Sequence, residues 1–134
     1  MPTKAKTPLP TSAELRILNV LWQLGEGTVD QIVSAFPARK RPNYKTTQAF
    51  LRIMEQKGFV RHAARGRVFV FEPIVRKEAV DQQSVQALVN QNFGGSARGL
   101  LLNLLESDAV EPSDLDAIEG LINEYRKRKS TPAS

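Results

Sequence analysis

Hydrophobic positions recur at helical spacing near the start of the chain. Two segments, residues 11–24 and 28–36, each begin with a Thr and carry Glu or Gln three residues later, the pattern of a capping box at a helix N-terminus. Each segment then places its apolar side chains on one face of a helix. These side chains are Leu15, Leu18, Leu21 and Trp22 in the first segment, and Val29, Ile32, Val33 and Phe36 in the second. The pattern predicts two short helices.

A third helix is expected from Asn43, a good N-cap, to about Lys57, just before the natural stop at Gly58. The inward side chains would be Thr47, Leu51 and Met54, with Phe50 at the edge of that face. The side chains facing away would be Lys45, Thr46, Gln48, Ala49 and Arg52. Residues 59–63 and 68–72 follow, rich in β-branched and aromatic side chains, and they flank a turn at Gly66. This arrangement predicts a β-hairpin.

The last part of the chain shows the helical pattern again, in three further segments. A fourth helix is expected from residue 74 to the break at 94–96, and Pro112 suits the first turn of a sixth. Leucines crowd the fifth helix on more than one face, so we expect it to be buried on more than one side. The sixth helix carries a seam typical of a coiled coil. Together these helices predict a dimer interface made by Leu100, Leu101, Leu104, Leu105, Leu115, Ile118, Ile122 and Tyr125.

Three helices, a hairpin and three more helices predict a mainly α fold with a small β-hairpin. This order is typical of a winged helix-turn-helix followed by a C-terminal helical dimerisation extension. The expected organisation is a disordered arm over residues 1–10, a winged-helix DNA-binding domain over 11–75, a helical dimerisation region over 76–129 and a tail over 130–134. The chain end "RKRKSTPAS", residues 126–134, is interpreted as basic and frayed.

Charge is distributed unevenly along the chain. Residues 1–36 hold three basic and three acidic side chains, residues 37–75 hold nine basic and two acidic, and residues 76–134 hold seven basic and nine acidic. The net charge of +7 on the middle segment indicates a surface that binds a polyanion.

DNA recognition needs cations that face phosphates and a few side chains that reach base edges. The first turn of the third helix supplies candidates for base edges, since Thr can contact a thymine methyl and Gln can pair with adenine. Basic residues before the helix and on the hairpin would hold flanking phosphates. The candidate DNA-binding set is Arg39, Arg41, Asn43, Tyr44, Lys45, Thr46, Thr47, Gln48, Arg52, Arg65 and Arg67.

Several stretches resemble the penicillinase repressor family of the BlaI and MecI type. Residues 11–22, "TSAELRILNVLW", are similar to its opening helix, and residues 44–73 resemble its recognition helix and wing. The similarity extends to about residue 128 and includes "LLLNLLESD". The resemblance implies a dimeric winged-helix repressor that binds a pseudo-palindromic operator and shuts off a resistance or stress operon. Ala49 and Ile53 depart from the family's usual residues, so the operator sequence does not carry over.

The resemblance also implies two ways in which repression could be relieved. Repressors of this type can be inactivated by a signalling protease that cuts an Asn-Phe bond, and the matching position here is Asn103-Leu104. We expect that bond to lie in a buried helix. A small ligand or a partner protein is the rival signal. The absence of Cys excludes the cysteine-based copper sensing of some relatives.

Other function classes fit the sequence less well. His62 is the only His and no Cys is present, so we expect no enzyme, no cofactor and no metal site, and His62 is interpreted as a wing-surface residue. With no signal-peptide pattern and no apolar run long enough for a membrane span, the expected location is the cytoplasm. The alternative is a winged-helix adaptor that binds protein, supported by Phe50 and Ile53. An RNA-binding function is a weaker alternative, because Tyr44 is the only aromatic residue among the basic ones.

Overall fold

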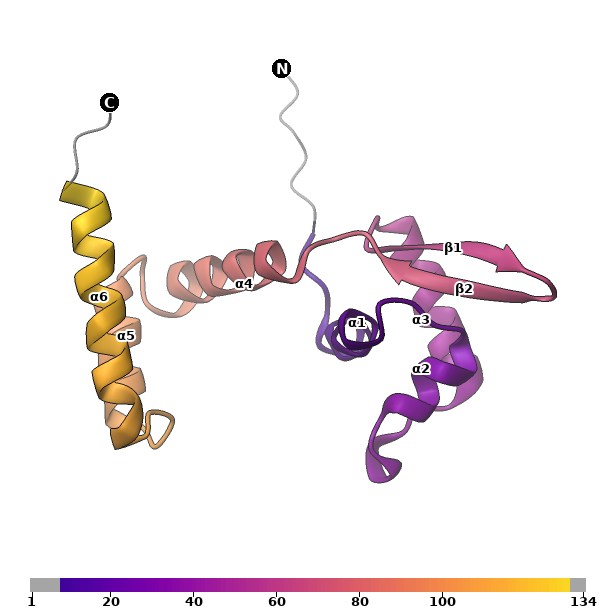
Figure 1. Cartoon of the computed structure of the whole chain (residues 1–134), viewed down its shortest axis with the longest axis horizontal. Coiled ribbons are helices and arrows are strands. Elements are labelled where there is room, and N and C mark those ends of the chain that lie inside the picture. The colour runs from indigo at the N-terminus through magenta and orange to yellow at the C-terminus, as the bar shows by residue number, and fades with distance from the viewer. Residues whose placement is uncertain (1–7, 131–134) are drawn as a thin grey trace, which may run out of the picture. The chain divides into compact units, whose positions relative to one another are not determined.

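The computed structural model describes residues 8–130, and the expected order of elements is present (Figure 1). Most of the expected arm, residues 1–7, and most of the expected tail, residues 131–134, lie outside this range. The elements are α1 (Ser12–Leu24), α2 (Val29–Ala35), η1 (Ala38–Lys40), α3 (Tyr44–Gln56), β1 (Val60–Arg65), β2 (Val68–Pro73), α4 (Lys77–Asn92), α5 (Ala97–Glu106), η2 (Pro112–Asp114) and α6 (Leu115–Ser130).

Both capping boxes expected from the sequence are present. The hydroxyl of Thr11 accepts from the backbone N–H of Glu14 at 3.2 Å, and the carboxylate of Glu14 accepts from the backbone N–H of Thr11 at 2.9 Å. Thr28 and Gln31 make the same reciprocal pair at the start of α2. These bonds satisfy backbone donors that a helix N-terminus leaves open, which is why α1 and α2 begin where they do.

One hydrophobic core lies among α1, α2, α3 and the hairpin. In α1 the apolar face is wider than the sequence predicted, because Ile17 and Val20 are buried together with Leu18 and Leu21. Trp22 is only half-buried, and its indole N–H donates to the backbone carbonyl of Val75 at 3.0 Å. The remaining core residues are Val29, Ile32, Phe36, Leu51, Met54, Phe59, Val60 and Phe71.

The hairpin is an antiparallel pair whose register runs from Val60 opposite Pro73 to Arg65 opposite Val68. Gly66 has a φ of 65°, a conformation that glycine adopts without strain, so the strands reverse in a tight turn. Gly27, between α1 and α2, adds a bridge to β2 through bonds of 2.9 and 2.8 Å with the backbone of Phe71. This bridge attaches the hairpin to the helical core.

The chain divides into two compact units, and the first ends at Val85 within α4. In the second unit, Val89 is the only buried residue among residues 86–130. The expected burial of α5 is therefore wrong for the single chain: Leu101, Leu104 and Leu105 are 37–47% exposed within the described residues. The basic end of the chain is also more ordered than expected, since α6 continues to Ser130. None of the helices within residues 8–130 is long and apolar enough to cross a membrane.

Candidate nucleic-acid interface

The start of α3 is held by hydrogen bonds of two residues of the candidate set, the exposed Asn43 and the buried Thr47. The side-chain oxygen of Asn43 accepts from the backbone N–H of Thr46 at 3.0 Å, so Asn43 is the N-cap. Thr47 is fully buried, and its hydroxyl donates to the backbone carbonyl of Asn43 at 3.0 Å. Thr47 faces inward as its helical position predicted. Its place in the DNA-binding set is therefore a correction, because a buried and bonded hydroxyl has no access to a base.

The outward face of α3 is exposed along its length. Lys45, Thr46 and Gln48 stand there in the first turns, followed by Ala49 and Arg52. All five face away from the core, as the periodicity predicted. Ile53 shares this face and is 42% exposed, while Phe50 is half-buried beside it. The face therefore offers hydrogen-bonding groups at one end of the helix and a small apolar area farther along.

The three cations of the loop before α3 differ in their contacts. Arg41 donates from Nη2 to the backbone carbonyls of Ser34 and Phe36, at 3.1 and 3.0 Å. These carbonyls belong to the end of α2, so the guanidinium of Arg41 closes that helix and shapes the loop. Arg39 and Lys40 lie in the η1 turn and are exposed. The charge of Arg41 remains at the surface, but its side chain has a structural role that the sequence did not show.

The two arginines at the tip of the hairpin also differ. Arg65 makes a bidentate ion pair with Glu26, at 2.6 and 3.0 Å. The hydrogen bond from Arg65 holds the pKa of Glu26 below its usual value, and Glu26 in turn raises the pKa of Arg65. Because Glu26 precedes the Gly27 bridge, this pair fixes the hairpin to the turn between α1 and α2. Arg67, in the turn itself, has no ion pair within the described part of the chain.

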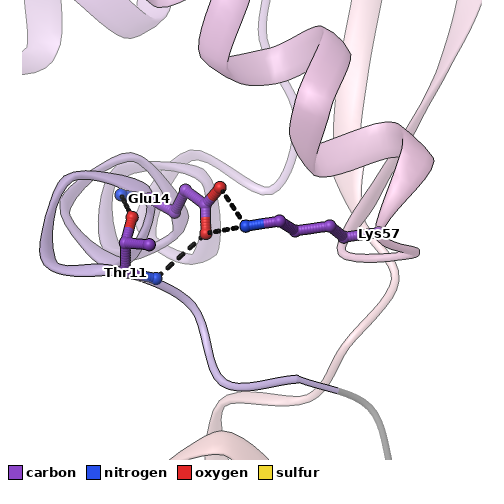
Figure 2. Close-up of polar contacts among 3 residues, drawn as sticks. All are labelled: Thr11, Glu14 and Lys57. Atoms are coloured by element: carbon purple, nitrogen blue, oxygen red, sulfur yellow. Dashed lines mark hydrogen bonds and ion pairs between the residues drawn. The ribbon is translucent and has the colours of Figure 1, made fainter.

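Three of the nine cations in residues 37–75 are thus neutralised by carboxylates. Besides Arg65 these are Arg61, which pairs with Glu72 across the hairpin at 2.6 Å, and Lys57, which pairs with the buried Glu14 at 2.8 Å (Figure 2). Within residues 8–130 the six without a carboxylate partner are Arg39, Lys40, Arg41, Lys45, Arg52 and Arg67. Glu14 was missed as a partner, although a carboxylate on the apolar face of α1 is a signal that a cation must come close to it.

The candidate dimerisation residues lie on α5 and α6 and are exposed or half-buried in the single chain. Leu100 and Ile118 are half-buried. The others, Leu101, Leu104, Leu105, Leu115, Ile122 and Tyr125, are exposed. The Asn103-Leu104 bond lies in α5 between two exposed residues, so the expectation that it is buried is wrong for the protomer. Whether this bond is cleaved stays a prediction.

Comparison with known proteins assigns the family. Residues 10–124 match the family described as Penicillinase repressor. The penicillinase repressor of Bacillus licheniformis is 24% identical over 124 residues, which covers 92% of this chain and 97% of that protein. The methicillin resistance regulatory protein MecI of Staphylococcus aureus strain N315 is 20% identical over 118 residues, covering 88% of this chain and 96% of that protein.

Two solved structures are also similar to part of the chain. The DNA-binding domain of the repressor BlaI is 28% identical and covers 54% of this chain and 88% of its own, with a TM-score of 0.48. The Bacillus licheniformis BlaI monomeric form in complex with the blaP half-operator is 27% identical and covers 55% of this chain and 89% of its own, with a TM-score of 0.47. The family match extends over most of the chain, from before α1 into α6. The chain therefore belongs to the penicillinase repressor family.

Proposed function

We propose that this protein is a sequence-specific, DNA-binding transcriptional repressor that acts as a homodimer on a pseudo-palindromic operator. The observation that carries the proposal is the exposed first half of α3, where Lys45, Thr46 and Gln48 stand outward. Thr and Gln side chains can read base edges in the major groove, and Lys can hold a phosphate. Because Asn43 caps the helix and the buried Thr47 bonds to its first turn, the outward side chains stand on a rigid element.

The cations around α3 are also placed suitably for binding DNA. Arg39 and Lys40 precede the helix, Arg52 lies farther along it, and Arg67 lies at the tip of the wing. Each is exposed and has no carboxylate partner within residues 8–130. Cations placed on both sides of a recognition helix can bind the phosphates that flank the bases it reads.

A winged-helix adaptor that binds protein is the alternative. It would require an apolar recognition face, since apolar area is what an exposed docking patch offers a protein partner. Ile53 and the half-buried Phe50 are the features that favour it. They share a shallow depression with Lys45, Thr46 and Ala49, so the apolar area is small and has polar neighbours. The face as a whole therefore fits DNA better than an apolar protein surface.

The homodimer is supported by the apolar surface of α5 and α6. Most of their leucines and of the 115/118/122/125 seam are exposed in the described protomer, and an apolar surface of this kind is stabilised by burial against a partner. We assign residues 11–75 to the DNA-binding domain and residues 76–129 to dimerisation. A cut at Asn103-Leu104 would separate α6 from the rest and weaken the dimer, and a helical bond must first unwind locally before a protease can reach it.

Selection of bound duplexes from a random DNA pool tests the proposal. A homodimer should enrich an inverted repeat, because two-fold symmetry in the protein is mirrored in the operator. The half-sites should lie at a spacing close to a whole number of helical turns. A pool that shows no enriched sequence would refute base reading, and a single unrepeated site would refute the symmetric dimer on DNA.

A further inference from the structure

A groove is lined by α3, the wing and the start of α2. Its volume is about 380 Å³, which is within the range of ligand sites in proteins. We refer to it as the wing groove. Its lining comes from all three elements: Thr28, Val29 and Asp30 from the start of α2, Tyr44, Gln48, Arg52 and Glu55 from α3, and His62, Arg67, Val68, Phe69 and Phe71 from the wing.

The wing side of the groove is aromatic. The His62 ring lies 4.4 Å from the ring of Phe69 and 5.5 Å from that of Phe71, measured between centroids, and both pairs are tilted. His62 is held in place because the carboxylate of Glu55 lies 2.7 Å from its Nδ1. Phe69 and the neighbouring Val68 are about half exposed, at 53% and 50%. This wall offers tilted aromatic faces and edges against which a planar ring can pack.

The groove contains two arginines whose guanidinium groups are available to an anion. The charged side chains of the lining are Arg52, Arg67, Asp30 and Glu55, and the carboxylate of Glu55 already contacts Nδ1 of His62. Neither arginine has an ion pair within residues 8–130. The groove therefore holds two guanidinium groups that make no ion pair within the described residues, beside two carboxylates of which Glu55 is hydrogen-bonded to His62. A guanidinium is well suited to bind a carboxylate through two parallel hydrogen bonds.

We propose that the wing groove binds a small aromatic carboxylate, and that ligand and operator bind in competition. A cavity of about 150 Å³ can hold one benzene ring, so 380 Å³ has room for a fused two-ring system with an acidic group. The aromatic wall makes the groove a better match for a planar ring than for a phosphodiester backbone. This inference rests on the proposed DNA-binding function, because Tyr44, Gln48, Arg52 and Arg67 belong to both sites.

Competition follows from thermodynamic linkage. If a ligand occupies Gln48, Arg52 and Arg67, it weakens operator binding by the same factor by which the operator weakens ligand binding. The wing groove would then make the repressor responsive to a metabolite directly. Release by such a ligand needs no cut in α5, so the intact chain would leave its operator.

The test uses the full-length protein and 2-naphthoate as the probe, followed by amide NMR. Shifts should concentrate at residues 28–30, 44–55 and 62–71. The uncharged 2-naphthamide and the non-aromatic cyclohexanecarboxylate should each bind about tenfold more weakly, which corresponds to one lost charge-assisted or aromatic contact. Arg67→Gln should bind 2-naphthoate about tenfold more weakly than the wild type does. The control Arg16→Gln removes an exposed arginine from α1, outside the lining, and should bind like the wild type.

Each outcome is decisive. No saturable shifts, equal affinity for naphthoate and naphthamide, or equal losses in Arg67→Gln and Arg16→Gln would overturn the assignment of the groove. A second measurement follows displacement of operator DNA by fluorescence anisotropy. If 2-naphthoate fills the groove and leaves operator affinity unchanged, the competition is refuted. Because NMR needs no DNA, a failure of DNA binding itself would be seen separately in the anisotropy of the ligand-free protein.

Discussion

The ammonium of Lys57, at the end of α3, lies 2.8 Å from the carboxylate of Glu14 in the first turn of α1 (Figure 2). Glu14 is 2% exposed, and it also accepts from the backbone N–H of Thr11. Burial by itself raises the pKa of Glu14, but the hydrogen bonds from Lys57 and Thr11 lower the pKa by more, so it lies below its ordinary value of 4.5. The pair thus ties the opening helix to the candidate recognition helix.

Removing the cation should destabilise the winged-helix unit strongly. In Lys57→Met the buried carboxylate of Glu14 loses its partner, and breaking a buried ion pair in this way costs roughly 3 kcal/mol in the free energy of unfolding. Urea denaturation followed by circular dichroism measures the change. The matched control is Arg61→Met, which breaks the exposed pair with Glu72 and should cost about 0–1 kcal/mol. Equal losses in the two variants would contradict the structural role of Lys57.

The same pair predicts a pH dependence with a definite sign. Because the pKa of Glu14 is lower in the folded protein, the unfolded chain takes up a proton first as the pH falls. The stabilisation is therefore complete above about pH 4.5 and is lost as the pH falls through the folded pKa. The stability difference between wild type and Lys57→Met should shrink over this range, since protonation removes the unpaired charge. A difference that stays constant with pH would show that packing, not charge, causes the loss.

Salt dependence should distinguish the two arginines of the wing. If the six cations without carboxylate partners each contact a phosphate, the affinity contributed by each bound protomer falls by roughly 10³-fold between about 50 and about 200 mM salt. Arg67→Gln should reduce the slope of log affinity against log salt by about 1 per bound protomer. Arg65→Gln should change it less, because Glu26 already neutralises that guanidinium. Anisotropy titrations at several salt concentrations measure the slopes. A flat response in the wild type would rule out phosphate binding by this surface.

Substitutions on α3 and on the wing should distinguish residues that read bases from residues that bind phosphates. Thr46→Ala or Gln48→Ala should weaken binding to the selected operator by about 1–3 kcal/mol and binding to random DNA much less. Arg67→Ala should weaken both alike, because a phosphate contact carries no sequence information. The ratio of the two affinities is the measured quantity. If all three substitutions leave this ratio unchanged, α3 does not read bases.

Truncation after Val85 should abolish dimerisation and leave the winged-helix unit folded. The buried residues of the core cluster lie between Ile17 and Phe71, so the remaining unit should keep its fold and its helical circular dichroism. It should be monomeric by light scattering and lose about 10²–10⁴-fold in operator affinity, because the second half-site no longer binds at high effective concentration. A full-length chain that is monomeric at micromolar concentration would exclude the dimer proposed for α5 and α6.

Local patterns in the sequence were sufficient for most of the fold. The Thr-x-x-Glu and Thr-x-x-Gln pairs placed the starts of α1 and α2, because a capping box is made by residues three positions apart. Asn43 and the following periodicity placed α3 and its exposed face in the same way. Gly66 between two β-rich segments placed the hairpin. These features depend on neighbours in the chain, so they can be read before any tertiary contact is known.

Tertiary structure alone decided which charges and surfaces are available. Lys57 pairs with Glu14 across 43 positions and Arg65 pairs with Glu26 across 39, so counting cations along the chain overestimated the free positive charge. The wing groove likewise needs α2, α3 and the hairpin brought together. The leucines of α5 show the same dependence, because a helix that is apolar on several faces is covered only if another surface packs on it. Such contacts join distant segments or separate chains, and no local pattern specifies them.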